Sequence, residues 1–116
     1  MRAIKLCFFG AGSIIEYHIN SFNNLKSVEL FSILSRSKEK SVILKKKYSI
    51  KNIYEDYRDF KNIKGPKIAI IGVSVMATFD VCKKVFNYFD YCFVEKPPGY
   101  NFLEAKKIYN LSRKKK

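Results

Sequence analysis

Short, almost wholly apolar stretches alternate along the chain with segments whose apolar residues recur every three or four positions. The apolar stretches predict strands at residues 3–9, 28–34, 53–54, 67–73 and 91–94. The periodic segments predict helices at residues 13–22, 38–47, 78–89 and 101–112, with one or two helical turns at 56–60. Because strands that alternate with helices form β-α-β units, the pattern predicts an α/β fold: a doubly wound parallel sheet in a single domain.

Two glycines, one residue apart, follow the first predicted strand. Gly10 permits a tight turn, and Gly12 lets a phosphate group approach the backbone because it has no Cβ. The helix that begins at Ser13 and Ile14 directs its N-terminal N–H groups at the same point. The third glycine of the G-x-G-x-x-G pattern is replaced by Ile15, so an ordinary turn is the alternative. The stretch predicts the phosphate-binding turn of a Rossmann-type domain.

Other polar residues directly follow predicted strands. In a parallel sheet the carboxyl ends of the strands meet at one edge, where the ligands of doubly wound folds bind. These residues and the glycines form the predicted cofactor-binding set: Gly10, Gly12, Ser13, Ile14, Ser35, Arg36, Ser74, Glu95 and Pro97. Their convergence is a stronger indication than the glycine pair alone.

The composition fits one domain of 116 residues, 47% of them hydrophobic. No apolar run approaches the ~20 residues of a membrane span, and the first residues lead into no signal peptide. Cys7, Cys82 and Cys92 form no C-x-x-C pair. Buried thiols in the cytoplasm, without a metal site, are the interpretation we favour.

The net charge of +13 raises the hypothesis of a nucleic-acid-binding protein. The lysines, however, are spread along the whole chain. The two basic runs, 45–47 and 113–116, fall at predicted helix C-termini, where cations complement the helix dipole. We therefore expect solvated helix ends, with a general attraction to polyanions at low salt and no specific nucleic-acid partner.

The spacing of Gly10, Gly12 and His18, the Ser35-Arg36 turn and the loop Glu95-Lys96-Pro97 resemble the glucose-fructose oxidoreductase, inositol dehydrogenase and rhizopine-catabolism family. The resemblance covers essentially the whole chain. It implies that residues 1–116 are the NAD(P)-binding domain of an oxidoreductase. Members of the family move a hydride between NAD(P) and the CH–OH carbon of a sugar, a cyclitol or a related compound.

The resemblance also implies a second α/β domain, which residues 1–116 do not contain. In the family that domain holds the substrate, supplies an acid/base histidine and often forms the dimer contact. We therefore expect a fragment or truncated product that has no turnover alone. A small-molecule substrate and a homo-oligomer are expected only with the second domain. The alternative is a non-catalytic nucleotide-binding module, complete as it stands, that works with a partner.

Lys96 is the predicted catalytic residue, because an ammonium group beside the nicotinamide can hydrogen-bond the substrate oxygen and stabilise the charge that develops there. Glu95 either orients Lys96 by an ion pair or caps the end of a strand. The resemblance suggests a cis peptide before Pro97, although trans is the commoner state. His18 is interpreted as a packed or surface histidine. The aromatic residues 54, 57 and 60 are assigned to the core, with Tyr57 near the cofactor edge as the alternative.

The turn after the second predicted strand favours NADP over NAD, with NAD still possible. An Asp or Glu at this point would bond the ribose hydroxyl and repel a 2′-phosphate, but the chain has Ser35-Arg36-Ser37. Arg36 can meet a phosphate with a planar, charged fork, and Ser35 can donate a hydroxyl bond. Lys40 could add a positive charge, while Glu39 is the main counter-argument. Ser74, after the fourth predicted strand, is expected either to meet the ribose or phosphate or to satisfy the backbone.

Overall fold

Five parallel strands form one sheet in the order β3-β2-β1-β4-β5. The structure is a computed structural model that describes residues 3–114. The strands are β1 (Ile4–Phe9), β2 (Val28–Leu34), β3 (Asn52–Ile53), β4 (Lys67–Ile71) and β5 (Tyr91–Val94). Chain order reverses at β1, which pairs with β2 on one side and with β4 on the other. The space between β1 and β4 is therefore the topological switch point, where ligands of such sheets bind.

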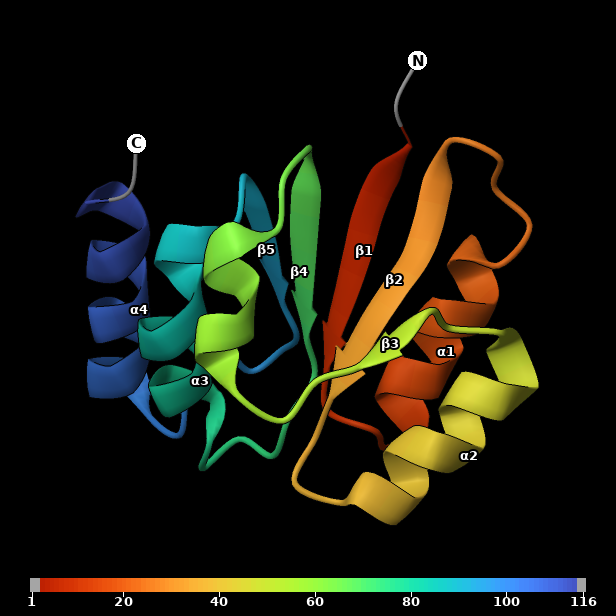
Figure 1. Cartoon of the computed structure of the whole chain (residues 1–116). Coiled ribbons are helices and arrows are strands. Elements are labelled where there is room, and N and C mark those ends of the chain that lie inside the picture. The colour runs from red at the N-terminus through yellow and green to blue at the C-terminus, as the bar shows by residue number, and fades with distance from the viewer. Residues whose placement is uncertain (1–2, 115–116) are drawn as a thin grey trace.

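Helices cover both faces of the sheet. They are α1 (Ser13–Phe22), α2 (Lys38–Tyr48), α3 (Thr78–Val85) and α4 (Phe102–Lys114), with 3₁₀ turns η1 (Tyr57–Asn62) and η2 (Phe86–Tyr88). Figure 1 shows α1 and α2 on one side of the sheet and α3 and α4 on the other. The predicted doubly wound, Rossmann-type fold in a single domain is confirmed.

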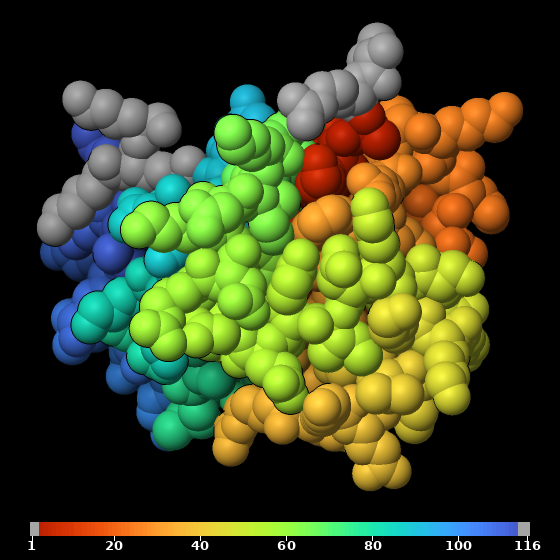
Figure 2. All heavy atoms as spheres, in the orientation of Figure 1, coloured from red at the N-terminus to blue at the C-terminus, as the bar shows by residue number. Residues whose placement is uncertain are grey.

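Alternation along β1 divides the core into two layers. Leu6 and Phe8 pack with α1 and α2, whereas Cys7 and Phe9 pack with α3 and η1. The ring of Phe9 stacks on Tyr57 at 5.9 Å, and the ring of Phe60 lies 5.3 Å away. Phe60 is thus buried in the core, and Tyr54 and Tyr57 are partly buried and pack against it, in line with the core assignment. Figure 2 shows the yellow-green connection between β3 and β4 covering the middle of the molecule in this view.

Backbone hydrogen bonds extend the ladder past the ends of the strands. The N–H of Gly10 donates to Leu34 O, and the N–H of Gly72 donates to Phe9 O, both at 2.9 Å. The N–H of Glu95 donates to Ile71 O at 3.0 Å. These bonds hold the ends of β2, β1, β4 and β5 level. The turns that follow them therefore lie along one edge, the lower one in Figure 1.

Several predicted boundaries differ from the structure, most of them by one or two residues. The fourth strand ends at Ile71 instead of 73, where the N–H of Gly72 donates to Phe9 O and Ile71 O accepts from the N–H of Glu95. The predicted helix 78–89 stops being α-helical at Val85, and the tighter turn η2 brings both Phe86 and Phe89 into the core. The short third strand is Asn52–Ile53 instead of 53–54.

Specific contacts define the ends of two helices. Ser37 caps α2, accepting a bond from Lys40 N at 3.2 Å. Asn101 caps α4, accepting a bond from Glu104 N at 2.9 Å. The lysines 45–47 lie in the last turn of α2. Of the second basic run, residues 115 and 116 lie outside the described part of the chain.

The cysteines lie in the core as expected. Cys7 and Cys82 are buried, and Cys92 is half-buried. Burial raises the pKa of the Cys7 thiol to about 12, so this thiol is inert at neutral pH. Within residues 3–114, no helix is long and apolar enough to cross a membrane.

Candidate functional site

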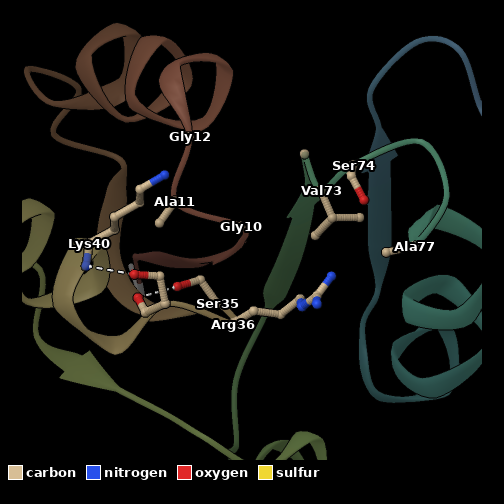
Figure 3. A pocket seen from close by; sticks show the side chains of 11 residues that line it. Gly10, Ala11, Gly12, Ser35, Arg36, Lys40, Val73, Ser74 and Ala77 are labelled. Carbon is tan, nitrogen blue, oxygen red and sulfur yellow. Dashed lines mark hydrogen bonds between the residues drawn. The ribbon is translucent and has the colours of Figure 1, made fainter.

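A hollow of about 240 Å³ opens at the carboxyl edge of the sheet, at the switch point between β1 and β4. The turns after β1, β2 and β4 line it (Figure 3). The lining residues are Gly10, Ala11, Gly12, Ser35, Arg36, Ser37, Lys40, Gly72, Val73, Ser74 and Ala77. The structure thus brings together five of the predicted cofactor-binding residues, contributed by three separate turns.

The two glycines of the first turn are required for different reasons. Gly10 has φ of +111°, and a Cβ there would lie 2.3 Å from the carbonyl oxygen of Gly72. The fold itself therefore demands glycine at position 10. Gly12 has an ordinary φ of −85°, and a Cβ there would meet no atom within 4 Å. Nothing in the folded chain demands glycine at position 12, where a side chain would project into open space.

The N-terminus of α1 has no side-chain cap. Gly12 occupies the N-cap position and makes no side-chain bond, in contrast to the caps of α2 and η1. The first N–H groups of a helix need partners outside the helix. Together with the dipole, they make this end of α1 suited to an anion. Ser13 is the first residue of α1 and is not among the residues that line this hollow, and its binding role stays a prediction.

Positive charge lines the β2 side of the hollow. Arg36 and Lys40 are exposed, and within residues 3–114 neither side chain has an ion-pair or hydrogen-bond partner. Figure 3 shows the Arg36 side chain extending toward Val73 and Ala77, across the hollow from its own turn. Glu39 is exposed and does not line the hollow. The site is therefore built for an anion on this side.

The Ser35 hydroxyl is expected to donate a hydrogen bond to a phosphate, but in the structure it is bonded within its own turn. It donates to Ser37 O at 2.8 Å and lies 2.7 Å from the Ser41 hydroxyl. These bonds shape the turn between β2 and α2. The Ser35 hydroxyl would have to give up its hydrogen bond to Ser37 O before it could donate to a ligand. The phosphate-binding role of Ser35 stays a prediction. Ser74 is exposed on the opposite wall, and its carbonyl accepts bonds from the first turn of α3.

The Glu95-Lys96-Pro97 loop lines a second hollow of about 220 Å³, next to the first. Its other lining residues are Ile14, Val73, Val75 and Thr78. Val73 lines both hollows, so they adjoin at the end of β4. Lys96 is exposed, and the Lys96–Pro97 peptide is cis, as the resemblance suggested. The predicted residues Ile14, Glu95, Lys96 and Pro97 therefore converge on this second hollow.

Sequence reasoning missed the partner of Glu95. His18 Nε2 lies 2.6 Å from Glu95 Oε2, across 77 positions of sequence. His18 is thus tied to the loop after β5 instead of being only a packed or surface residue. This hydrogen bond lowers the pKa of the Glu95 carboxyl, helped by the Lys96 backbone N–H and opposed by partial desolvation. In the sequence, the only indication of this contact was that Glu95 belongs to a group of polar residues expected at one edge of the sheet.

Gly72 was also missed as a site residue. A Cβ there would lie 2.9 Å from Ile15 Cδ1 and 3.2 Å from Ile14 Cγ2. The bare backbone of Gly72 therefore admits the first turn of α1 next to the end of β4. Close packing of this kind is the task of the third glycine in the usual fingerprint. Here the larger residue, Ile15, lies on the helix, and the glycine directly follows strand β4.

Comparison with known proteins identifies relatives of this architecture. A family model described as "Oxidoreductase family, NAD-binding Rossmann fold" (GFO_IDH_MocA) matches residues 4–116. No curated protein matches the sequence. The chain is similar to solved structures at low identity, which shows a shared fold.

Three of these structures illustrate the range. The myo-inositol dehydrogenase from Lactobacillus casei, in complex with NAD(H) and myo-inositol, has a TM-score of 0.86 and 18% identity. A putative NADPH-dependent oxidoreductase from Desulfitobacterium hafniense has a TM-score of 0.87 and 16% identity. A 3-ketoreductase from Actinomadura kijaniata, in complex with NADP, has a TM-score of 0.82 and 12% identity.

These similarities cover nearly all of this chain and a minor part of each relative. They span 97%, 97% and 98% of the chain, but only 34%, 32% and 36% of the respective relatives. The chain thus spans about a third of the length of these structures. On the match of the family model over residues 4–116, this chain belongs to the oxidoreductase family with an NAD-binding Rossmann fold.

Proposed function

We propose that this chain is the NADP-binding domain of an oxidoreductase that acts on the CH–OH group of a sugar, a cyclitol or a related compound. The observation that carries the proposal is the space in front of Gly12. A Cβ there would touch no protein atom, and Gly12 lines the hollow at an uncapped helix N-terminus. A pyrophosphate fits such a cradle, because it needs close backbone approach and N–H donors.

The two hollows suit the two halves of a dinucleotide. In this assignment the backbone of residues 12–14 binds the pyrophosphate, and Arg36 holds the adenosine half in the first hollow. The second hollow, with Ile14, Val73 and Pro97 as apolar walls, receives the nicotinamide. The cofactor supplies the hydride acceptor or donor when it is bound.

Lys96 is the residue assigned to chemistry in this proposal. It lies on the rim of the second hollow and is exposed, so its ammonium can reach a substrate that lies over the nicotinamide. A hydrogen bond from Lys96 to the substrate oxygen would stabilise the negative charge that develops on that oxygen. The family and the inositol dehydrogenase neighbour support a polyol as the substrate class.

The preference for NADP rests on the charge around the first hollow. None of the described residues that line it is acidic, while Arg36 and Lys40 are both unpaired there. A carboxylate that would repel a 2′-phosphate is therefore missing from the lining, and a bidentate guanidinium is present. NAD remains able to occupy the same cradle without that additional contact.

Titration of the 116-residue chain with NADPH and NADH, followed by cofactor fluorescence, tests the proposal. We expect tighter binding of NADPH, and in Arg36→Ala an NADPH Kd about tenfold higher, as for the loss of a charge-assisted hydrogen bond. The NADH Kd should stay unchanged. Lys46→Ala, which removes an exposed cation on α2 away from the hollow, is the matched control. Equal affinities for the two cofactors, or an NADPH affinity untouched by Arg36→Ala, would refute the assignment.

A further inference from the structure

The side chains of His18 and Glu95 join two parts of the site that are far apart in sequence. Their contact is 2.6 Å long, and the side chains are 29% and 32% exposed. His18 lies on α1, whose N-terminus faces the first hollow, and Glu95 begins the loop that lines the second. His18 is the only histidine of the chain. The contact therefore links the predicted phosphate-binding helix to the loop that carries Lys96.

Glu95 is fixed at both its backbone and its side chain. Its N–H donates to Ile71 O at 3.0 Å, and its carboxylate meets His18. The backbone N–H of Lys96 also helps to lower the pKa of this carboxyl, after the larger effect of His18. Glu95 is therefore tied to α1 through its side chain and to β4 through its backbone, directly before Lys96 in the chain.

The far end of the loop has its own anchor. Glu104 Oε1 accepts the N–H of Tyr100 at 2.9 Å, and Asn101 caps α4. The segment between the anchors is short, spanning only residues 96–99. A shift of Glu95 would therefore move Lys96 directly, since the loop has little slack on its other side.

We infer that His18 is a positioning residue: by bonding Glu95 it holds Lys96 and Pro97 at the edge of the nicotinamide hollow, in register with the helix that binds the pyrophosphate. This inference rests on the proposed function of the site. The nicotinamide half of the cofactor should sense the loss of the contact, and the adenosine half should not. His18 itself lines neither hollow.

The competing explanation is a half-exposed ion pair that adds only a little stability. The chain contains a matched example on the same helix. Lys47 Nζ lies 2.6 Å from Glu16 Oε2 and joins α1 to the last turn of α2, away from both hollows. A comparison of the two pairs separates a positioning role from a generic tie between elements.

The test compares two ligands on the 116-residue chain by calorimetry: NADPH, and adenosine 2′,5′-bisphosphate as the adenosine half alone. In His18→Leu we expect the NADPH Kd to rise about fivefold, which is ~1 kcal/mol. The Kd of the bisphosphate should not change. His18→Gln, which keeps an N–H donor with similar reach, should restore most of the NADPH affinity. Lys47→Leu should leave both Kd values unchanged.

Amide hydrogen exchange supplies a readout that needs no ligand. The amides of Lys96, Gly99 and Tyr100 should exchange faster in His18→Leu than in wild type, and not in Lys47→Leu. An unchanged ratio of the two Kd values in His18→Leu, or an equal change in Lys47→Leu, overturns the inference. So does unchanged exchange of the loop amides. If wild type binds neither ligand, the proposed function fails, and exchange alone decides whether His18 holds the loop.

Discussion

The side chain of Ile15 lies over the bare backbone of Gly72. A Cβ built on Gly72 would be 2.9 Å from Ile15 Cδ1 and 3.0 Å from Ile15 Cγ1. Ile15 is fully buried, so it has little room to withdraw. The contact sets how closely the first turn of α1 approaches the end of β4, and with it the width of the first hollow.

Gly72→Ala should destabilise the fold by about 1–3 kcal/mol, the usual cost of overpacking. In an Ile15→Ala background the same change should cost clearly less, because the two closest atoms are gone, and Ile14 Cγ2, at 3.2 Å, remains in tight contact. Urea unfolding of the four proteins of this double-mutant cycle measures the coupling. Additive costs would show that Ile15 and Gly72 do not constrain one another.

Gly10 and Gly12 should respond to alanine in opposite ways. Gly10→Ala forces a side chain into positive φ and against Gly72 O, so a loss of about 3 kcal/mol or more is expected. Gly12→Ala should change stability by less than ~1 kcal/mol, since it alters only an N-cap. It should nevertheless weaken NADPH binding at least about tenfold, because its Cβ occupies the cradle.

Thermal unfolding and NADPH titration of both variants check this contrast. Tight NADPH binding by Gly12→Ala would contradict the placement of the pyrophosphate. A Gly10→Ala protein as stable as wild type would contradict the conformation of the turn.

The fold was predictable because its determinants are local and periodic. The apolar runs that became β1, β2 and β4 are covered strands that are buried toward their carboxyl ends, whereas alternate residues of the edge strand β5, Tyr91 and Phe93, are exposed. Apolar residues of α1, α2 and α3 pack against the sheet in the two core layers. Boundaries failed where tertiary packing decided them. The α-helical geometry of α3 ends at Val85 because η2 must bury Phe86 and Phe89 before β5 begins, which no local pattern reveals.

The sequence could predict the site only where a general rule applies, namely that the carboxyl ends of parallel strands meet at one edge of the sheet. That rule brought Gly10, Ser35, Arg36 and Ser74 to one hollow. It could not reveal side-chain partners across the sheet. The bond between His18 and Glu95 depends on how α1 packs against the sheet. Likewise, the contact between the hydroxyls of Ser35 and Ser41 depends on how α2 packs beside the turn.

The 116-residue chain is expected to show no turnover with polyols and NADP. The hollow beside Lys96 is open to solvent, and the only histidine of the chain is already bonded to Glu95. General acid–base help, typically ~10²–10⁴-fold, would have to come from Lys96 alone. NADPH formation should be measured over a panel of sugars and cyclitols, with Lys96→Ala as the control. Turnover that disappears in Lys96→Ala would contradict this expectation.

The Glu95 carboxyl should make the free energy of unfolding depend on pH in the acid range. His18, and to a smaller extent the Lys96 N–H, lower the pKa of this group in the folded chain. The unfolded state therefore binds a proton at a higher pH than the folded state does. It follows that the stabilisation from Glu95 is fully present above the unfolded pKa, near 4.3, and is lost as the pH falls through the folded pKa.

Glu95→Gln removes this titration. The stability difference between wild type and Glu95→Gln should be largest at pH 6–7 and should shrink as the pH is lowered below about 4.3. Urea unfolding at a series of pH values, followed by far-UV circular dichroism, measures it. Glu16→Gln should behave in the same direction, because Lys47 and Tyr48 lower the pKa of Glu16. A difference for Glu95→Gln that stays constant or grows toward acid pH would mean that the folded chain does not favour the ionised carboxylate, and that the bond with His18 is not formed as described.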